Sequence, residues 1–178
     1  MAKKAPVVSD KYTNILSASK RILGRSGYGG LTLASIAHES KLDRQLVYYH
    51  FKKTDDVVIA LTQEWDQSGV NHTLHTLAQS HETGAFKSIA MVQGIFRWLR
   101  EDPEICRLTF ALFQAASEIP TVQKLMQEGA QRGRDRLRSF IKADSRFQKI
   151  KKKDLEGLVD SLHRYMYGVF FYVIALNR

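Results

Sequence analysis

Residues 31–53 read LTLASIAHESKLDRQLVYYHFKK, and this pattern predicts two short helices separated by a tight turn. Thr32 and Asp43 both favour the N-cap position, where a side-chain oxygen accepts a hydrogen bond from the first turn of a helix. The second of the two helices is predicted over residues 44–51, after a break around residues 40–42. This spacing is typical of a helix-turn-helix, in which the second helix lies in the major groove of DNA.

The predicted second helix has two different faces. At 100° per residue, an arc of about 140° carries polar and aromatic side chains. These are Arg44, Gln45, Tyr48 and Tyr49. Val47 and Phe51 point the other way and can pack on neighbouring helices. Because arginine pairs with guanine, glutamine pairs with adenine, and tyrosine can reach a phosphate or a thymine methyl group, the first face can read base edges.

The rest of the chain also shows helical periodicity, and strict strand-type alternation of apolar and polar residues is absent. Further helices are predicted over residues 9–25, from 55 to 68 or as far as 79, from 89 to 102, from 105 to 117, from 121 to 142 and from 154 to 176. The last of these is apolar all round from Tyr165, which predicts burial against a second subunit. The predicted fold class is all-α, with a helical bundle following the helix-turn-helix.

The charge is concentrated at the amino-terminal end of the 178-residue chain. Before Thr54 there are 10 basic and 3 acidic residues, a net charge of +7, whereas from Thr54 onward there are 17 and 15, a net charge of +2. A basic segment suits a polyanion such as DNA. We therefore expect a DNA-binding domain over residues 1–53 and a second domain over residues 54–178.

The sequence argues against several other classes of protein. A single cysteine, Cys106, excludes an intrachain disulfide framework, and the chain start has no secretory signal. The longest apolar stretch is shorter than the roughly 20 residues that a bilayer requires, so no membrane partner is expected. His72 and His75 are predicted to be solvated or to line a pocket, and no metal site is expected. Motifs for a zinc protease, a dinucleotide or a phosphate-binding loop are incomplete, so we expect neither an enzyme nor a cofactor.

The predicted helix-turn-helix and the residues around it, roughly residues 11–58, resemble the amino-terminal domain of the TetR family of bacterial transcription regulators. The resemblance is carried by Ile15-Leu16-x-Ala18, Gly27-Tyr28, Thr32, Ile36-Ala37 and the run from Leu42 to Lys53, above all Val47-Tyr48-Tyr49-His50-Phe51-Lys52. It implies a cytoplasmic, nucleoid-associated homodimer that represses transcription from double-stranded operator DNA. It also implies that a small molecule binds residues 54–178, the effector-binding and dimerisation domain, and releases the DNA.

The resemblance also assigns roles to single residues. Thr32 and His50 are expected to touch phosphate, and Arg44, Gln45 and Tyr49 to face bases. Tyr48 is expected at phosphate or base, and Lys52 or Lys53 at the DNA backbone. The chain departs from the family at three places: Ser40-Lys41 replaces the usual Ala-Gly, Leu46 replaces a small or hydroxyl residue, and only one apolar helix ends the chain. Lys41 adds a cation near the DNA.

The effector itself is expected to be small and largely apolar, because the second domain has little net charge and many aromatic residues. The candidate pocket residues are Trp65, Phe86, Phe96, Phe110, Phe113 and Tyr165. An alternative function is a helical DNA-binding or interaction module that has no effector. A ligand-sized cavity among the later helices distinguishes the two.

Overall fold

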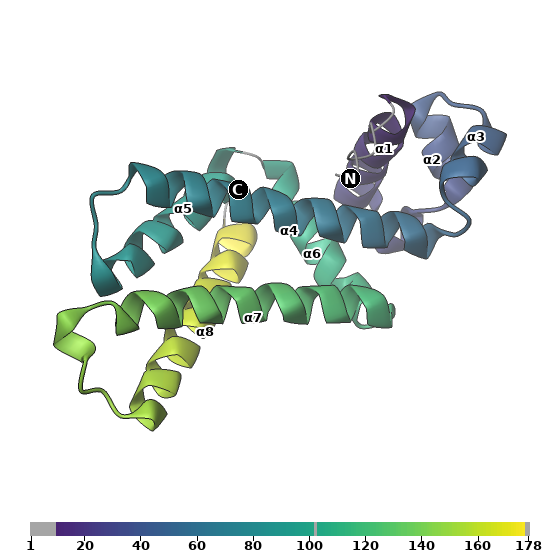
Figure 1. The fold of residues 1–178 in the computed structure, drawn as a ribbon. Coiled ribbons are helices and arrows are strands. Elements are labelled where there is room, and N and C mark those ends of the chain that lie inside the picture. The colour runs from purple at the N-terminus through teal and green to yellow at the C-terminus, as the bar shows by residue number, and fades with distance from the viewer. Residues whose placement is uncertain (1–9, 102, 177–178) are drawn as a thin grey trace, which may run out of the picture.

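A computed structural model describes residues 10–101 and 103–176, and within these ranges all of the regular structure is helical (Figure 1). The α-helices are α1 (Asp10–Ser26), α2 (Leu33–Ser40), α3 (Arg44–His50), α4 (Thr54–Gln79), α5 (Lys87–Glu101), α6 (Pro103–Ala116), α7 (Pro120–Lys142) and α8 (Lys152–Leu176). Short 3-10 turns are η1 (Tyr28–Gly30), η2 (Gly84–Phe86) and η3 (Ser145–Phe147). The all-α prediction is confirmed.

Helices α2 and α3 form the helix-turn-helix that the sequence predicts, and α1 packs against them. The Thr32 hydroxyl accepts a hydrogen bond from the Ser35 amide (3.0 Å), and an Asp43 carboxylate oxygen accepts one from the Gln45 amide (2.7 Å). Both predicted N-caps are therefore confirmed. Ile15, Ile36 and Val47 place one fully buried apolar side chain from each helix into the shared core.

The longest helix, α4, continues to Gln79 and takes in the histidine-containing stretch. Thr73 and Thr76 are buried on this stretch, where α5 approaches closely through Gly94. A Cβ added to Gly94 would lie 2.9 Å from the Thr76 hydroxyl oxygen. Close packing on a glycine of α5 thus stabilises the polar end of α4, and the longer of the two predicted lengths is correct.

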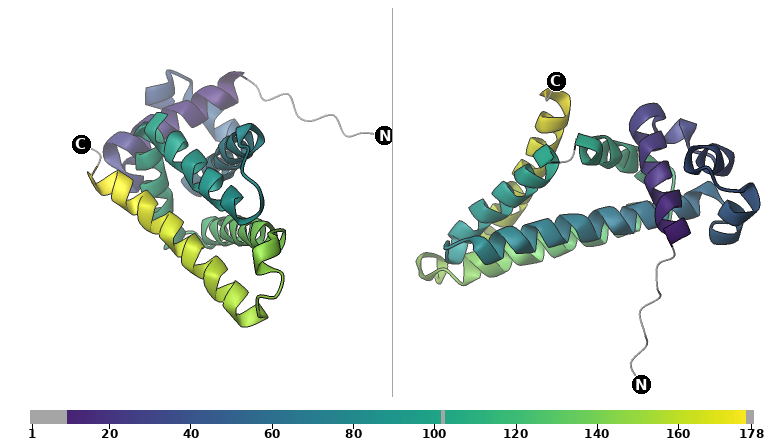
Figure 2. Two further views of the ribbon diagram at one scale, coloured as in Figure 1. Left: turned by 90° about the vertical axis from the view of Figure 1, so that its left-hand side faces the viewer. Right: turned by 90° about the horizontal axis from the view of Figure 1, so that it is seen from above.

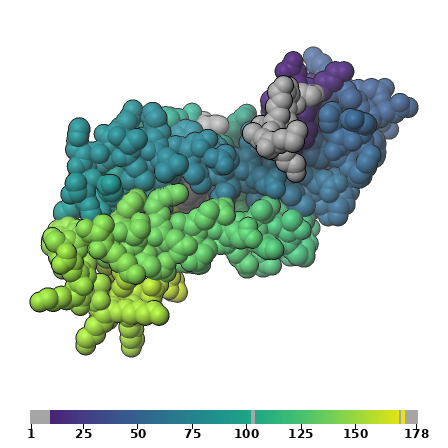
Figure 3. All heavy atoms as spheres, in the orientation of Figure 1, coloured from purple at the N-terminus to yellow at the C-terminus, as the bar shows by residue number. Residues whose placement is uncertain are grey.

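The remaining helices build the bundle that surrounds the second half of α4. Helices α4 and α7 run side by side, and α8 crosses behind them (Figures 1 and 2). Leu137 and Ile141 of α7 pack with Leu155 and Val159 of α8 in one apolar cluster. In the space-filling view the helix-turn-helix projects from one end of this bundle (Figure 3). Among the described helices, none is long and apolar enough to span a membrane.

Candidate nucleic-acid interface and ligand cavity

Helix α3 presents its predicted polar and aromatic face to solvent. Tyr49 is 75% exposed and Tyr48 is 47% exposed, and Arg44 and Gln45 are also exposed. Val47, on the opposite side, is fully buried. The burial of one face and the exposure of the other leave these four side chains available to the edges of base pairs.

Aromatic contacts fix the carboxyl end of α3 against α1. The rings of Tyr12 and Phe51 stack with centroids 5.3 Å apart. The half-buried His50 ring lies between Tyr12 (5.9 Å) and Tyr49 (5.3 Å), edge-on to each. The packing of His50 therefore orients Tyr49.

The turn between α2 and α3 contains the departure from the family pattern. Lys41 adopts the left-handed conformation with φ 56° and ψ 33°, and its amide donates a hydrogen bond to the His38 carbonyl (3.2 Å). A glycine adopts this conformation without strain, whereas a lysine does so at a cost. The lysine side chain is exposed.

Two exposed lysines lie between α3 and α4. The Lys52 ammonium donates a hydrogen bond to the Tyr48 carbonyl (3.1 Å), and the Lys53 ammonium lies 3.6 Å from the Asp55 carboxylate. Asp56 accepts hydrogen bonds from the amides of both lysines (3.2 and 3.1 Å). Their backbone is thus held at the start of α4, while both charged groups remain at the surface.

A cavity of about 110 Å³ lies among α4, α5, α7 and α8, and α6 contributes Phe113 to it. Both tryptophans of the chain line this cavity: Trp65 from α4 and Trp98 from α5, with ring centroids 6.0 Å apart. The Trp65 indole N–H donates a hydrogen bond to the Thr109 hydroxyl (2.8 Å), which fixes the plane of that ring. The walls are mostly apolar and aromatic, as small-molecule sites usually are.

A few polar groups interrupt these apolar walls. Asp66 and Arg132 form an ion pair at 2.6 Å, and Arg136 lines the cavity one turn further along α7. The His163 ring is buried and meets Tyr167 edge-on at 4.9 Å. Burial lowers the pKa of His163, the positive charge of Arg134 lowers it further, and Asp160 opposes both effects. Burial raises the pKa of the Tyr167 hydroxyl.

Two of the six aromatic residues proposed from sequence, Trp65 and Phe113, line the cavity, and the other four lie outside it. Phe86 lies beneath the Arg146 guanidinium, whose carbon is 4.5 Å from the ring centroid. Phe110 and Tyr165 are exposed, and Phe96 is half-buried elsewhere on α5. The sequence alone does not distinguish the aromatic residues that line the cavity from those that lie outside it, because the direction of each side chain depends on how the helices pack.

Sequence reasoning missed Trp98, Arg132, Arg136 and Tyr167 as cavity residues. One signal was available, since Gly129 and Gly133 lie four residues apart on one face of α7. A Cβ at Gly129 would lie 2.7 Å from an Asp66 carboxylate oxygen, and one at Gly133 would lie 3.3 Å from His163 Nε2. A pair of glycines at this spacing in a helix indicates a close approach by another group.

Residues 15–61 match the model of the family described as bacterial regulatory proteins, tetR family. This segment contains α2, α3 and most of α1, together with the start of α4. No curated protein is significantly similar to the sequence.

Solved structures share the fold over nearly the whole chain. A TetR transcription regulator from Haloarcula marismortui is 18% identical with a TM-score of 0.79, over 94% of this chain and 88% of that one. A protein described as a transcriptional regulator from Saccharomonospora viridis, in complex with choline, is 16% identical with a TM-score of 0.75, over 93% and 86%. The multidrug binding protein EbrR, in complex with imidazole, is 20% identical with a TM-score of 0.69, over 96% and 87%.

Proposed function

We propose, from the premise that this chain is a transcriptional regulator with the amino-terminal domain of the TetR family, that it represses transcription and leaves its operator when a small molecule binds. The observation that carries the proposal is the exposed face of α3, on which Arg44, Gln45, Tyr48 and Tyr49 lie opposite the fully buried Val47. A helix with such a surface can enter the major groove while its inner face holds it on the domain. The protein would act on the nucleoid in the cytoplasm.

The same long helix connects the DNA-binding domain to the cavity. Helix α4 begins at Thr54, directly after the two lysines, and its middle turns line the cavity through Trp65 and Gly69. A ligand that fits better when α4 is displaced would favour a position of α3 that does not match the groove. A ligand with equal affinity for both positions would release nothing.

Exposed aromatic residues on α8 support a homodimer. Tyr165 is 64% exposed, Tyr172 67% and Phe171 44%, and all three lie on the last helix. A second subunit that covers this face removes its apolar surface from water, which favours association of the two subunits. A dimer also doubles the number of base pairs that a short recognition helix can read, which favours a two-fold-symmetric operator.

The cavity supports an effector, in preference to a DNA-binding module that has none. Two of the structures with this fold are described as complexes with the small molecules choline and imidazole. In this chain the cavity has polar groups at defined positions as well as aromatic walls, as small-molecule sites do.

Selection of DNA from a random library by the full chain tests the proposal, and we expect an enriched palindrome. Sedimentation at micromolar concentration should show a dimer. The absence of an enriched sequence, or a monomer at that concentration, would contradict the proposed operator recognition.

Two substitutions separate base reading from phosphate contact. Arg44→Ala should cost about 1 to 3 kcal/mol and relax the preference at one position per half-site. Lys52→Ala should weaken binding to all sequences alike and reduce the salt slope by about one per subunit. Arg97→Ala, at an exposed position on α5, is the matched control and should change neither.

A further inference from the structure

We propose that the cavity selects a small aromatic monocarboxylate, with its ring against Trp65 and Trp98 and its carboxylate on Arg136. This inference rests on the proposed function, because it names the class of effector that would occupy the cavity. It replaces the expectation of a largely apolar molecule with one that has a defined charge.

The volume and walls of the cavity suit one aromatic ring. A cavity of about 150 Å³ lined by apolar side chains holds benzene, and the cavity here is about 110 Å³ and partly open. Trp65 and Trp98 present their rings to it, and Phe113 and Met126 add further apolar surface. The two tryptophan rings contact each other, with centroids 6.0 Å apart, so a third ring would stack on or lie edge-on to the surface that they present to the cavity.

The charged groups at the cavity carry an excess of one positive charge. Asp66 is neutralised by Arg132 at 2.6 Å, which leaves the guanidinium of Arg136. In the described part of the chain, no carboxylate forms an ion pair with Arg136. Burial lowers the pKa of the His163 imidazole, which favours its uncharged form.

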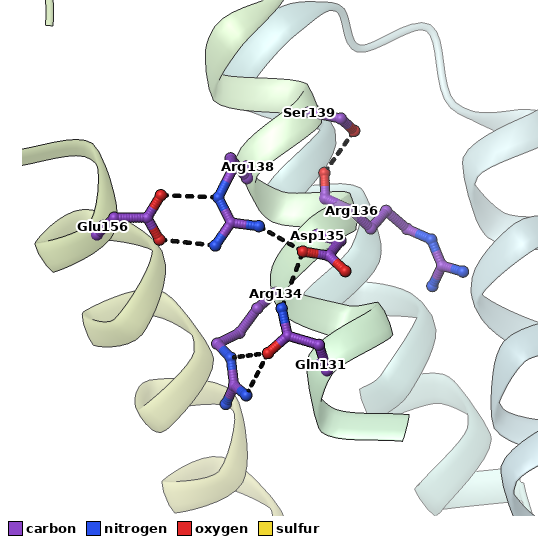
Figure 4. Close-up of polar contacts among 7 residues, drawn as sticks. All are labelled: Gln131, Arg134, Asp135, Arg136, Arg138, Ser139 and Glu156. Atoms are coloured by element: carbon purple, nitrogen blue, oxygen red, sulfur yellow. Dashed lines mark hydrogen bonds and ion pairs between the residues drawn. The ribbon is translucent and has the colours of Figure 1, made fainter. Parts of the chain in front are cut away.

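Neighbouring arginines of α7 show why Arg136 differs from them. Arg138 contacts Asp135 and pairs with Glu156 of α8 (2.6 Å), and Arg134 donates to Gln131 (2.7 Å). In Figure 4 the Arg136 side chain points away from this network, to the other side of α7. Its planar guanidinium is therefore available to a carboxylate, which it can bind through two parallel hydrogen bonds.

A cationic ligand fits these observations less well. Two tryptophans suit a quaternary ammonium group through cation–π contacts. Such a cation would nevertheless have to compete with Arg132 for Asp66, and it would lie close to the Arg136 charge. A neutral ring would leave the guanidinium partly desolvated without a partner, which costs free energy.

Intrinsic fluorescence of the full chain measures binding directly, because the only two tryptophans both line the cavity. Titration without DNA compares three probes with the same ring: benzoate, benzyl alcohol and benzyltrimethylammonium. A charge-assisted pair should make benzoate bind about 10- to 100-fold more tightly than either of the others.

Substitution of Arg136 then tests the anchor. Arg136→Gln should remove the preference for benzoate, and Arg136→Lys should keep part of it, because the charge remains but the paired hydrogen bonds do not. Lys124→Gln, at an exposed position of α7 outside the cavity lining, is the matched control and should bind benzoate as the wild type does. Thermal melting of each variant checks that it folds.

Each possible result decides the proposal. Benzoate binding no more tightly than benzyl alcohol, a preference for the ammonium probe, no saturable signal from any probe, or full affinity in Arg136→Gln would overturn it. If Arg136→Gln does not fold, the ranking of the probes on the wild type and the result for Arg136→Lys still decide whether the proposal holds. Because no DNA is present, failure here leaves operator binding intact, and failure of operator binding leaves the ligand class standing.

Discussion

Lys41 ends α2 in the left-handed conformation, with φ 56°, and its side chain is exposed in the turn before α3. This conformation costs a residue that has a Cβ about 1 to 2 kcal/mol of folding stability. Glycine removes this cost, but its greater freedom in the unfolded chain cancels part of the gain. Lys41→Gly should therefore stabilise the domain by about 0.5 to 1 kcal/mol, measured by urea unfolding. If the ammonium group meets phosphate, the same substitution should weaken DNA binding and lower its salt dependence.

Lys41→Ala separates these two effects. Alanine removes the charge as glycine does but keeps the strained backbone. The two variants should bind DNA equally and differ in stability by about 1 kcal/mol. Equal stability of the two variants would show that the turn relaxes to another conformation.

Glu39 joins α2 to α1 through two arginines. Arg21 and Arg25 each donate a hydrogen bond to its carboxylate (2.9 Å), and these bonds lower the pKa of Glu39 from its ordinary 4.5 to about 2. Because the pKa is lower in the folded protein, the stability that this carboxylate contributes is complete above pH 4.5 and is lost as the pH falls toward about 2.

The measurement is the difference in Tm between the wild type and Glu39→Gln. We expect the wild type to melt at the higher temperature near neutral pH and the difference to disappear as the pH approaches about 2. Glu128→Gln, at an exposed position on α7, is the control and should show little difference at any pH. A difference for Glu39 that stays constant with pH would mean that packing, and not the charge, is responsible.

At this scale the sequence predicts local features well and distant ones poorly. Thr32 and Asp43 cap helices whose first turns follow directly in the chain, so residue type and spacing suffice to identify them. The ring contact between Tyr12 and His50 joins residues that are far apart in sequence. No local pattern reports such a contact, because it depends on how α1 packs against α3.

The segment before α5 and the segment after α7 meet at one end of the bundle, and Asp144 joins them. Its carboxylate accepts hydrogen bonds from the Arg146 guanidinium (2.6 Å) and from the Ala85 amide of η2 (3.0 Å), and these bonds hold its pKa well below the ordinary range. Gly84 has φ +53°, and a Cβ there would lie 2.7 Å from the same carboxylate. Only glycine accommodates both the conformation and the contact.

Gly84→Ala should therefore destabilise the protein by more than about 1 kcal/mol, measured by denaturant unfolding. The matched control is Gly157→Ala on α8, where a Cβ would have no neighbour within 4 Å. This control should gain about 0.5 to 1 kcal/mol, since alanine is the better helix former. Equal effects of the two substitutions would show that the loop at Gly84 moves freely away from Asp144.

Helix ends illustrate what the sequence can and cannot predict at the scale of elements. Helices α5 and α6 end close to the predicted positions, because Pro103 and Pro120 start the helices that follow them and are visible in the sequence. The sequence left the end of α4 undecided, because residues 69–79 are polar. The stretch is helical since Thr73 and Thr76 pack against Gly94 of α5, a tertiary contact.

At the scale of the whole molecule, one apolar core extends from the helix-turn-helix into the bundle. Ile15 of α1, Val57 of α4 and Leu112 of α6 are fully buried members of the same cluster. A domain division after residue 53 follows the change in charge, but the packing continues across it. A shift of α4 would therefore have to be accompanied by a shift of α1 and α3.

If α3 reads the operator as proposed, this continuity predicts that binding in the cavity and binding of DNA at α3 affect each other. A coupling of about 1 to 3 kcal/mol would lower operator affinity by about 5- to 150-fold when benzoate, or whichever probe saturates the tryptophan signal, occupies the cavity. Thermodynamic linkage then requires operator DNA to weaken binding of that probe by the same factor. Calorimetry measures both directions: DNA titrated with and without the probe, and the probe titrated with and without the operator found by selection. Lys124→Gln should retain the coupling. Arg136→Gln should lose it only through weaker binding, so that saturation with a higher probe concentration restores it. If a probe binds tightly and leaves operator affinity unchanged, the cavity is not the switch, because a ligand shifts an equilibrium only by its difference in affinity for the two states.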